Sequence, residues 1–188
     1  MSWKTTAFIV TLAIAPNAAA QVVTPPAVPA NLEVPEGNTP YLMAHAEGTQ
    51  NYVCVPTSTG HMWSFFGPQA TLFDAVGQQV TTHFLSPSPA GTPRATWQHS
   101  GDTSTAWAAA IASSTDPVFV APGAIPWLLL DVVASEDGPG GGATLTPTTF
   151  IQRVNTAGGI APATGCKSAK DTGKKALVPY TTDYVFYR

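Results

Sequence analysis

The residues best suited to chemistry in this sequence lie in two neighbouring segments, at His83 and between Trp97 and Asp102. His99, Ser100 and Asp102 are the three residue types of a hydrolase triad, but that relay geometry normally gathers residues from separate segments. We therefore predict that His99 to Asp102 forms a turn. An aromatic face beside polar groups suits a sugar or another small ligand, so His83, Trp97, His99 and Asp102 are predicted to form a ligand-binding cleft.

Common catalytic and metal-binding motifs are absent from the sequence. It holds no Gly-x-Ser-x-Gly, no His-Glu-x-x-His and no phosphate loop. Its four histidines stand singly, so a metal site would need three strands to bring them together. We therefore expect no metal and no cofactor. The alternative is a hydrolase whose site is assembled across strands near the four residues of the cleft. The histidines are His45, His61, His83 and His99.

Arg153 has two competing interpretations. Residues 125–134 are apolar at both alternating sets, which is typical of a strand covered on both faces, and Asp131 interrupts the run. If the Gly-rich connection that follows folds as a hairpin centred near Gly142, Asp131 lies opposite Arg153 and they form a structural ion pair. Alternatively, Arg153 binds an anionic ligand beside Gly158-Gly159, whose backbone amides would cradle a phosphate or carboxylate.

The elements that must position these side chains are predicted to be β-strands. From residue 38 onward, short apolar runs alternate with Gly, Pro, Ser and Thr, and no 3.6-residue apolar period lasts three turns. This pattern predicts a single all-β domain over residues 38–188, an antiparallel sandwich or barrel with long Pro/Gly-rich loops. The predicted strands are 51–56, 61–66, 70–73, 79–85, 95–99, 104–113, 125–134, 149–155 and 178–187.

The segment before this domain has the pattern of an export signal. Lys4, the apolar residues 7–15 and the small residues 18–20 predict a signal peptide over residues 1–20. The apolar stretch is shorter than the roughly 20 residues that span a bilayer, so we expect cleavage and no membrane span. The protein is then secreted or periplasmic. Residues 21–37 hold four prolines and are predicted to form an extended tether or an arm packed on the surface.

The sequence contains two cysteines, Cys54 and Cys166. An exported chain meets an oxidising environment, in which paired thiols become a disulfide, so we predict one bridge between them. A redox or metal pair would usually show a close C-x-x-C spacing, which is absent here.

Charge is sparse and uneven along the 188 residues. Only 10% of them are charged, the net charge is -3, and 44% are hydrophobic, so a folded core is expected. The acidic balance disfavours nucleic-acid binding, which calls for clustered lysine and arginine.

The charge is distributed unevenly: residues 21–166 carry a net charge of -7 and residues 167–188 carry +3. The lysines of this second segment lie in a loop that is either solvated or in contact with an anionic wall polymer or lipid. They are Lys167, Lys170, Lys174 and Lys175.

A series of short segments along the chain, taken together and in order, identifies a protein family more specifically than any one of the segments does alone. The segments are Gly48–Cys54, His83, Trp97, Ala124–Leu130, Ile151–Gly159, Ala161-Pro162, Gly165-Cys166 and Tyr180–Tyr187. The set resembles a family of secreted bacterial and fungal proteins known as domain of unknown function 3455. The resemblance runs from about Leu32 to the C-terminus. It implies a single extracytoplasmic domain with both cysteines in its pattern, and no established activity, cofactor or catalytic residue.

These observations favour a secreted β-domain that is non-catalytic and serves in binding or structure. Its expected partner is a surface glycan, a small ligand or another protein. A binding protein should show an exposed aromatic surface or an apolar groove. An enzyme should show a pocket whose titratable groups have strongly shifted pKa values.

Overall fold

The computed structural model describes residues 23–188, so the predicted signal peptide over residues 1–20 lies outside the described residues. Within that range the chain forms eight β-strands and two three-residue 3-10 helices, η1 (Ala30–Leu32) and η2 (Ala169–Asp171). The prediction of an all-β fold is confirmed. The strands are β1 (Pro40–Thr57), β2 (Gly60–Phe73), β3 (Gln79–Pro87), β4 (Pro93–His99), β5 (Thr105–Ser114), β6 (Trp127–Glu136), β7 (Phe150–Gly158) and β8 (Lys175–Tyr187).

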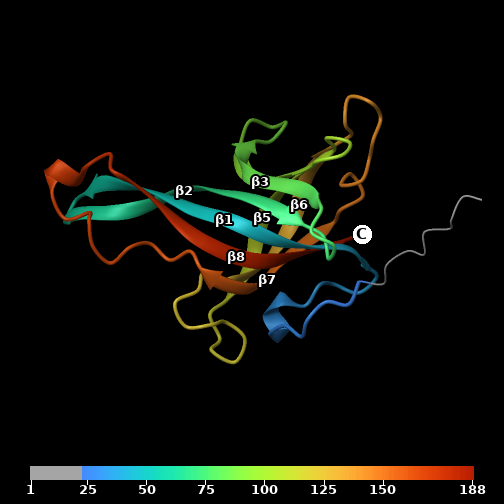
Figure 1. Cartoon of the computed structure of the whole chain (residues 1–188), viewed down its shortest axis with the longest axis horizontal. Helices are drawn as coiled ribbons and strands as arrows, with labels where there is room; N and C mark the ends of the chain where they lie inside the picture. Colours follow the sequence, from blue (N-terminus) through green and yellow to red (C-terminus); the bar gives the residue numbers. More distant parts are fainter. Residues whose placement is uncertain (1–22) are drawn as a thin grey trace, which may run out of the picture.

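The eight strands form a closed antiparallel barrel in which each strand pairs with the next along the chain (Figure 1). β8 pairs with both β7 and β1, which closes the sheet. Closure removes the unpaired edge strands that an open sheet would expose. Of the two architectures that the sequence allows, the chain therefore adopts the barrel.

Two strands, β1 and β2, differ most from the prediction, while the boundaries of the other six differ by three residues or fewer. The predicted strands 61–66 and 70–73 are one continuous strand, β2, whose pairing with β1 shifts register where Asn51 faces Gly67 and Tyr52 faces Phe65. β1 begins at Pro40, well before the predicted residue 51. This first half of β1 is poor in the β-branched residues that mark strands, because small residues face the barrel interior there.

Gly48 shows why small residues are needed at that place. It pairs with Ala70 of β2, and a Cβ atom at residue 48 would overlap the backbone carbonyl oxygen of Gln69 and the Cα of Ala70. The two strands therefore approach too closely for any side chain at this position. At this position the close packing of β1 against β2, and not intrinsic strand propensity, determines which residue the strand contains.

The outer face of β6, β7 and β8 is covered by the proline-rich segment that precedes the barrel. Leu32 of η1 is fully buried against this face, and the Gln152 side-chain amide donates a 2.7 Å hydrogen bond to the Leu32 carbonyl oxygen. Trp127 and Leu129 pack beneath the segment, while Leu130 faces the barrel interior. This cover explains why β6 is apolar at both alternating sets of positions.

The predicted ion pair between Asp131 and Arg153 is wrong. Asp131 pairs with Phe150, and Arg153 pairs with Leu128, so the hairpin register is shifted by three residues from the one assumed. Successive side chains of a strand point to opposite faces, so an odd shift places the two residues on opposite sides of the sheet. Arg153 lies on the interior face with Ile151, and Asp131 lies on the outer face.

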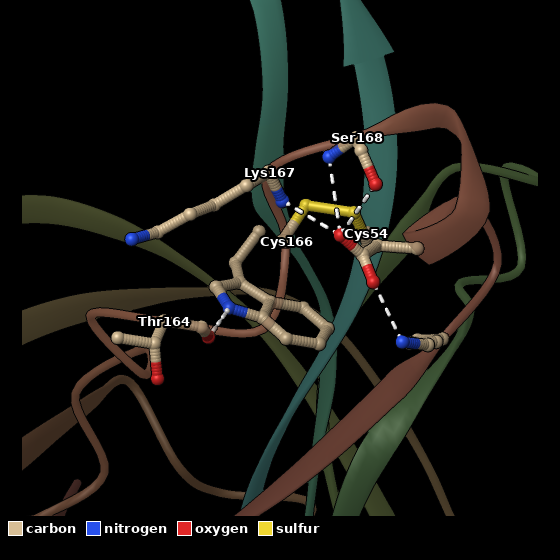
Figure 2. The surroundings of a disulfide bond; sticks show 8 residues. Cys54, Thr164, Cys166, Lys167 and Ser168 are labelled. Atoms are coloured by element: carbon tan, nitrogen blue, oxygen red, sulfur yellow. Dashed lines mark hydrogen bonds and ion pairs between the residues drawn. A yellow bond between two sulfur atoms is a disulfide. The ribbon is translucent and has the colours of Figure 1, made fainter.

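β1 and β2 continue beyond the barrel as a long hairpin, and the first residues of β8 pair with β1 along part of it (Figure 1). The predicted disulfide is present between Cys54 and Cys166, whose Cα atoms are 5.5 Å apart. It fastens the β7–β8 connection to the hairpin, as Figure 2 shows. The Trp63 indole N–H also donates a 3.0 Å hydrogen bond to the Thr164 carbonyl oxygen. The hairpin and this connection therefore form one braced unit.

Candidate functional site

A cavity of about 310 Å³ opens into the barrel interior, at the end where β3 and β5 finish and β4 and β6 begin. Along β5 its wall consists of Ala108, Ala109 and Ala110, whose small side chains leave the space open. The residues that line it elsewhere are Gln50, Phe65, Pro68, His83, Leu85, Pro93, Arg94, Ala95, Trp97, Leu128, Leu130, Arg153 and Tyr184.

Two arginines line the cavity, and no carboxylate does. Arg153 is half-buried, and its Nε and Nη2 atoms donate hydrogen bonds of 3.2 and 2.8 Å to the Pro126 carbonyl oxygen. Neither Arg153 nor Arg94 takes part in any ion pair found within residues 23–188. The Pro126 carbonyl fixes the direction of the Arg153 guanidinium without neutralising it. The cavity therefore carries positive charge in a chain whose net charge is -3.

His83 and Trp97 are brought together, as the sequence predicted for a ligand-binding cleft. They are paired across β3 and β4, with ring centroids 4.2 Å apart and planes 15° apart. The Tyr184 ring meets both of them edge-on, at centroid distances of 5.1 and 5.3 Å. The three rings form a rigid aromatic wall beside Arg153, which pairs directly with Tyr184 across β7 and β8.

His83 is neutral in this wall. Its Nδ1 donates a 2.9 Å hydrogen bond to the Thr96 carbonyl oxygen, because a carbonyl can only accept. Burial lowers the pKa of His83 to about 3; the bond to Thr96 opposes this shift, and the positive charge of Arg153 adds to it. The imidazole therefore does not neutralise an anion by protonation near neutral pH. Arg153 is the charged group of this wall.

Two buried donors at the cavity have no hydrogen-bond acceptor among the described protein atoms. They are Gln50 Nε2 and the Trp97 indole Nε1, in residues that are 3% and 0% exposed. Buried polar groups of folded proteins are nearly always hydrogen-bonded, so these two donors are exceptions. Both nitrogen atoms are themselves buried, so they lie behind the cavity surface and are not open to a ligand there. Burial raises the pKa of Tyr184, so its phenol stays protonated as well.

His99 and Asp102 do not join His83 and Trp97 at this cavity. They lie in the β4–β5 turn toward the opposite end of the barrel, where the predicted turn at residues 99–102 is present. Asp102 Oδ1 accepts hydrogen bonds from His99 Nδ1 and from the backbone and hydroxyl of Ser104. Its Oδ2 accepts from the backbone and hydroxyl of Thr144.

This network fastens the β4–β5 turn to the Gly-rich β6–β7 connection. Burial acts to raise the pKa of Asp102, but the hydrogen bonds from Thr144 and Ser104 outweigh it and hold the pKa well below its usual range. A carboxylate whose two oxygens are both engaged by donors from two neighbouring loops has a structural role. Of the four residues predicted to form one cleft, His83 and Trp97 thus line the cavity, whereas His99 and Asp102 belong to a turn that the Asp102 network holds in place.

The Gly158-Gly159 segment does not offer the anion cradle of the second interpretation in full. The Gly159 backbone N–H donates a 2.9 Å hydrogen bond to the Pro179 carbonyl oxygen, so it is already engaged. The Gly159 carbonyl oxygen accepts a 2.7 Å hydrogen bond from the Tyr52 hydroxyl. The positive charge of this region therefore comes from Arg153, and the Gly159 amide is not free to add to it.

Gln50, Arg94 and Tyr184 were missed by the sequence analysis as members of the site. Alternation along a strand carries the missing signal, because residues two apart share a face. Once β7 is oriented by Ile151, which is buried in the interior, Arg153 must also point inward. The strand register determines which residues of β1 and β8 lie beside Arg153 in the barrel. The sequence does not specify that register.

The described residues 23–188 contain no group of three or more His, Cys, Asp or Glu side chains placed to hold a metal ion. None of the helices in that same range is long and apolar enough to cross a membrane.

The fold and the cavity define a closed eight-stranded antiparallel β-barrel with an arginine-bearing pocket at one end. The chain belongs to the family described as Protein of unknown function (DUF3455), whose profile matches residues 35–188. The matched range includes all eight strands and both cysteines. Neither the curated proteins nor the solved structures gave a significant match to the chain.

Proposed function

We propose that the protein is a non-catalytic, extracytoplasmic binding protein whose barrel takes up a small organic anion with a flat, apolar body, such as an aromatic carboxylate. The observation that carries this proposal is the position of Arg153, on the wall of an interior cavity that contains two guanidinium groups and no carboxylate. The disulfide between Cys54 and Cys166 supports the extracytoplasmic location, because such bonds persist in oxidising compartments.

A half-buried guanidinium without an acidic partner favours an anionic ligand. Removing a charge from water is unfavourable unless an opposite charge or good hydrogen bonds compensate for it. The planar fork of arginine matches a carboxylate, which it binds through two parallel hydrogen bonds. Arg153 is held in place by Pro126. Its preorganised guanidinium would lose little side-chain entropy on binding.

The remainder of the cavity favours a small and largely apolar body behind the anionic group. Leu85, Leu128 and Leu130 line it together with the Trp97 ring. Its volume of about 310 Å³ lies at the small end of the range for ligand pockets, roughly 300–1,000 Å³. The stacked pair of His83 and Trp97 lies almost fully buried behind this lining and keeps that part of the wall rigid.

The lining supports binding over hydrolysis. Covalent catalysis needs a nucleophile beside a general base, and the described cavity wall includes no Ser, Thr, Cys, Asp or Glu. His83, the nearest candidate base, has its Nδ1 engaged with Thr96 and a pKa far below neutral. Asp102, the carboxylate of the alternative hydrolase site, serves the loop on the other side of the barrel.

The test is calorimetric titration of the purified protein with benzoate, hexanoate and the neutral analogue benzyl alcohol. We expect benzoate to bind more tightly than benzyl alcohol, and Arg153→Gln to weaken benzoate binding about 10- to 100-fold, the range for a charge-assisted hydrogen-bonded contact. Benzyl alcohol binding should be unaffected by the same substitution.

Arg188→Gln is the matched control, because it removes the same charge from an exposed residue outside the cavity. It should leave benzoate affinity unchanged. The proposal fails if Arg153→Gln and Arg188→Gln have equal effects, or if the unmodified protein binds neither carboxylate.

A further inference from the structure

We propose that the braced hairpin end of the molecule docks onto an anionic lipid surface. This end, called the lysine end below, comprises residues 52–66 and 159–177. It lies beyond the barrel, where the β1–β2 hairpin and the β7–β8 connection run together (Figure 1). The inference concerns the lysines and exposed apolar side chains of this end; of these, Phe65 also lines the Arg153 cavity, and the others do not. It does not depend on the proposed function.

Charge is separated along the molecule. All four lysines of the described chain lie in the lysine end, with one acidic residue, Asp171, so this end carries +3. The remaining described residues carry three arginines and ten acids, a net charge of -7. Such a molecule is oriented by a negatively charged surface, with the lysine end foremost.

Three of the four lysines have no ion pair within the described chain. Asp171 Oδ1 accepts a 2.6 Å hydrogen bond from Lys174 Nζ, and its Oδ2 accepts from the backbone N–H groups of Lys167 and Ser168. The side chains of Lys167, Lys170 and Lys175 are exposed. These three can therefore meet external anions without first breaking an internal salt bridge.

The lysine end also exposes apolar side chains, which an anionic polysaccharide would not use. Met62, Phe66 and Leu177 are 55%, 39% and 58% exposed. Half of the large apolar residues exposed on the described chain lie in this end; the five are Met62, Phe65, Phe66, Ile160 and Leu177.

Part of this apolar set shares one face of the hairpin extension. Met62 pairs with Val55, Lys175 pairs with Val53, and Lys175 Nζ lies 5.6 Å above the Phe66 ring. Because directly paired residues point to the same face, these side chains form a mixed apolar and basic surface. Apolar groups with neighbouring lysines are the combination that binds the interface of an anionic bilayer.

The disulfide makes this surface rigid. Cys54 and Cys166 tie the lysine-bearing connection to the hairpin that carries Met62 and Phe66 (Figure 2). The backbone N–H groups of Cys54 and Gly173 also donate hydrogen bonds to the carbonyl oxygens of Lys174 and Cys54, respectively. Binding to a surface therefore needs little further ordering of this part of the chain.

The test is cosedimentation of the protein with vesicles of phosphatidylcholine alone and vesicles in which phosphatidylglycerol replaces part of it. We expect binding to the anionic vesicles at low salt, little binding to phosphatidylcholine, and weaker binding as salt screens the charges. The combined variant Lys167→Gln, Lys170→Gln and Lys175→Gln should lose about fivefold in partitioning per lysine.

A second variant tests the apolar contribution. Met62→Thr with Leu177→Thr should reduce vesicle binding. Val76→Thr with Val118→Thr, which changes two apolar and even more exposed side chains outside the lysine end, should not. Thermal melting checks that every variant is folded. The proposal is overturned if anionic vesicles are not bound at low salt, or if the two double variants behave alike. It is also overturned if the lysines direct binding to alginate but not to vesicles, which would indicate an anionic polymer.

Discussion

Acid should destabilise this protein through His83. The folded protein holds this imidazole neutral, with a pKa of about 3 against an ordinary value of 6.5. A proton therefore binds preferentially to the unfolded chain. The stabilisation is complete above pH 6.5 and is lost progressively as the pH falls from 6.5 toward 3.

The size of the effect follows from the difference between the two pKa values. Each pH unit below 6.5 lowers the free energy of unfolding by about 1.4 kcal/mol, so the loss is about 2 kcal/mol at pH 5. The local structure explains this resistance to protonation. His83 is buried against Trp97, and the charge that acts on it from inside the barrel is the positive Arg153.

Urea unfolding at pH 7.5, 6 and 5 measures this loss in the unmodified protein and in His83→Phe. Phenylalanine keeps an aromatic ring against Trp97 and cannot take up a proton, although it loses the hydrogen bond to Thr96. We expect the substitution to remove about 2 kcal/mol of the stability difference between pH 7.5 and pH 5.

His61→Phe, in the hairpin outside the barrel, is the control and should leave that difference unchanged. The explanation is refuted if the stabilities of the unmodified protein and of His83→Phe fall by the same amount between pH 7.5 and pH 5.

Two further predictions concern the braces of the fold. Replacing both cysteines by serine removes a cross-link between residues 112 positions apart. The free energy of unfolding, measured by guanidinium titration, should fall by up to about 4–5 kcal/mol. Adding a reductant to the unmodified protein should give the same result. Asp102→Asn replaces one of the two acceptor oxygens by an NH2 group, so the backbone N–H of either Thr144 or Ser104 loses its acceptor and stability should fall by about 2 kcal/mol. Asp116→Asn, in an exposed turn, should cost less than 1 kcal/mol in the same titration.

Most of the fold could be predicted because strand alternation and turn composition are local properties of the sequence. The apolar residues on both faces of β6 indicated a strand with two covered sides, and the structure shows interior packing on one side and the η1 segment on the other. The first half of β1 escaped prediction because Gly48 and the alanines before it favour a strand only once Ala70 is packed against them.

The site was less predictable, because its residues come from strands far apart in the sequence. His83 and Trp97 could be associated, since they lie on consecutive strands, but their separation from His99 and Asp102 depends on where the barrel cavity ends. Gln50 and Tyr184 reach the cavity only through the pairing of β1 with β8 and of β7 with β8. A short window of sequence carries no information about pairing between strands that lie so far apart in the chain.

The position of Arg153 shows how strongly register decides function in a barrel. With the symmetric hairpin that the Gly-rich connection suggested, Arg153 would have paired with Asp131, and its charge would have been neutralised within the sheet. The connection instead folds back on Asp102 through Thr144, and the pairing of β6 with β7 is shifted by three residues from that register. An odd shift reverses the face of every side chain on the strand. The three-residue shift thus places an unpaired guanidinium at the cavity, and not opposite a carboxylate on the outer face.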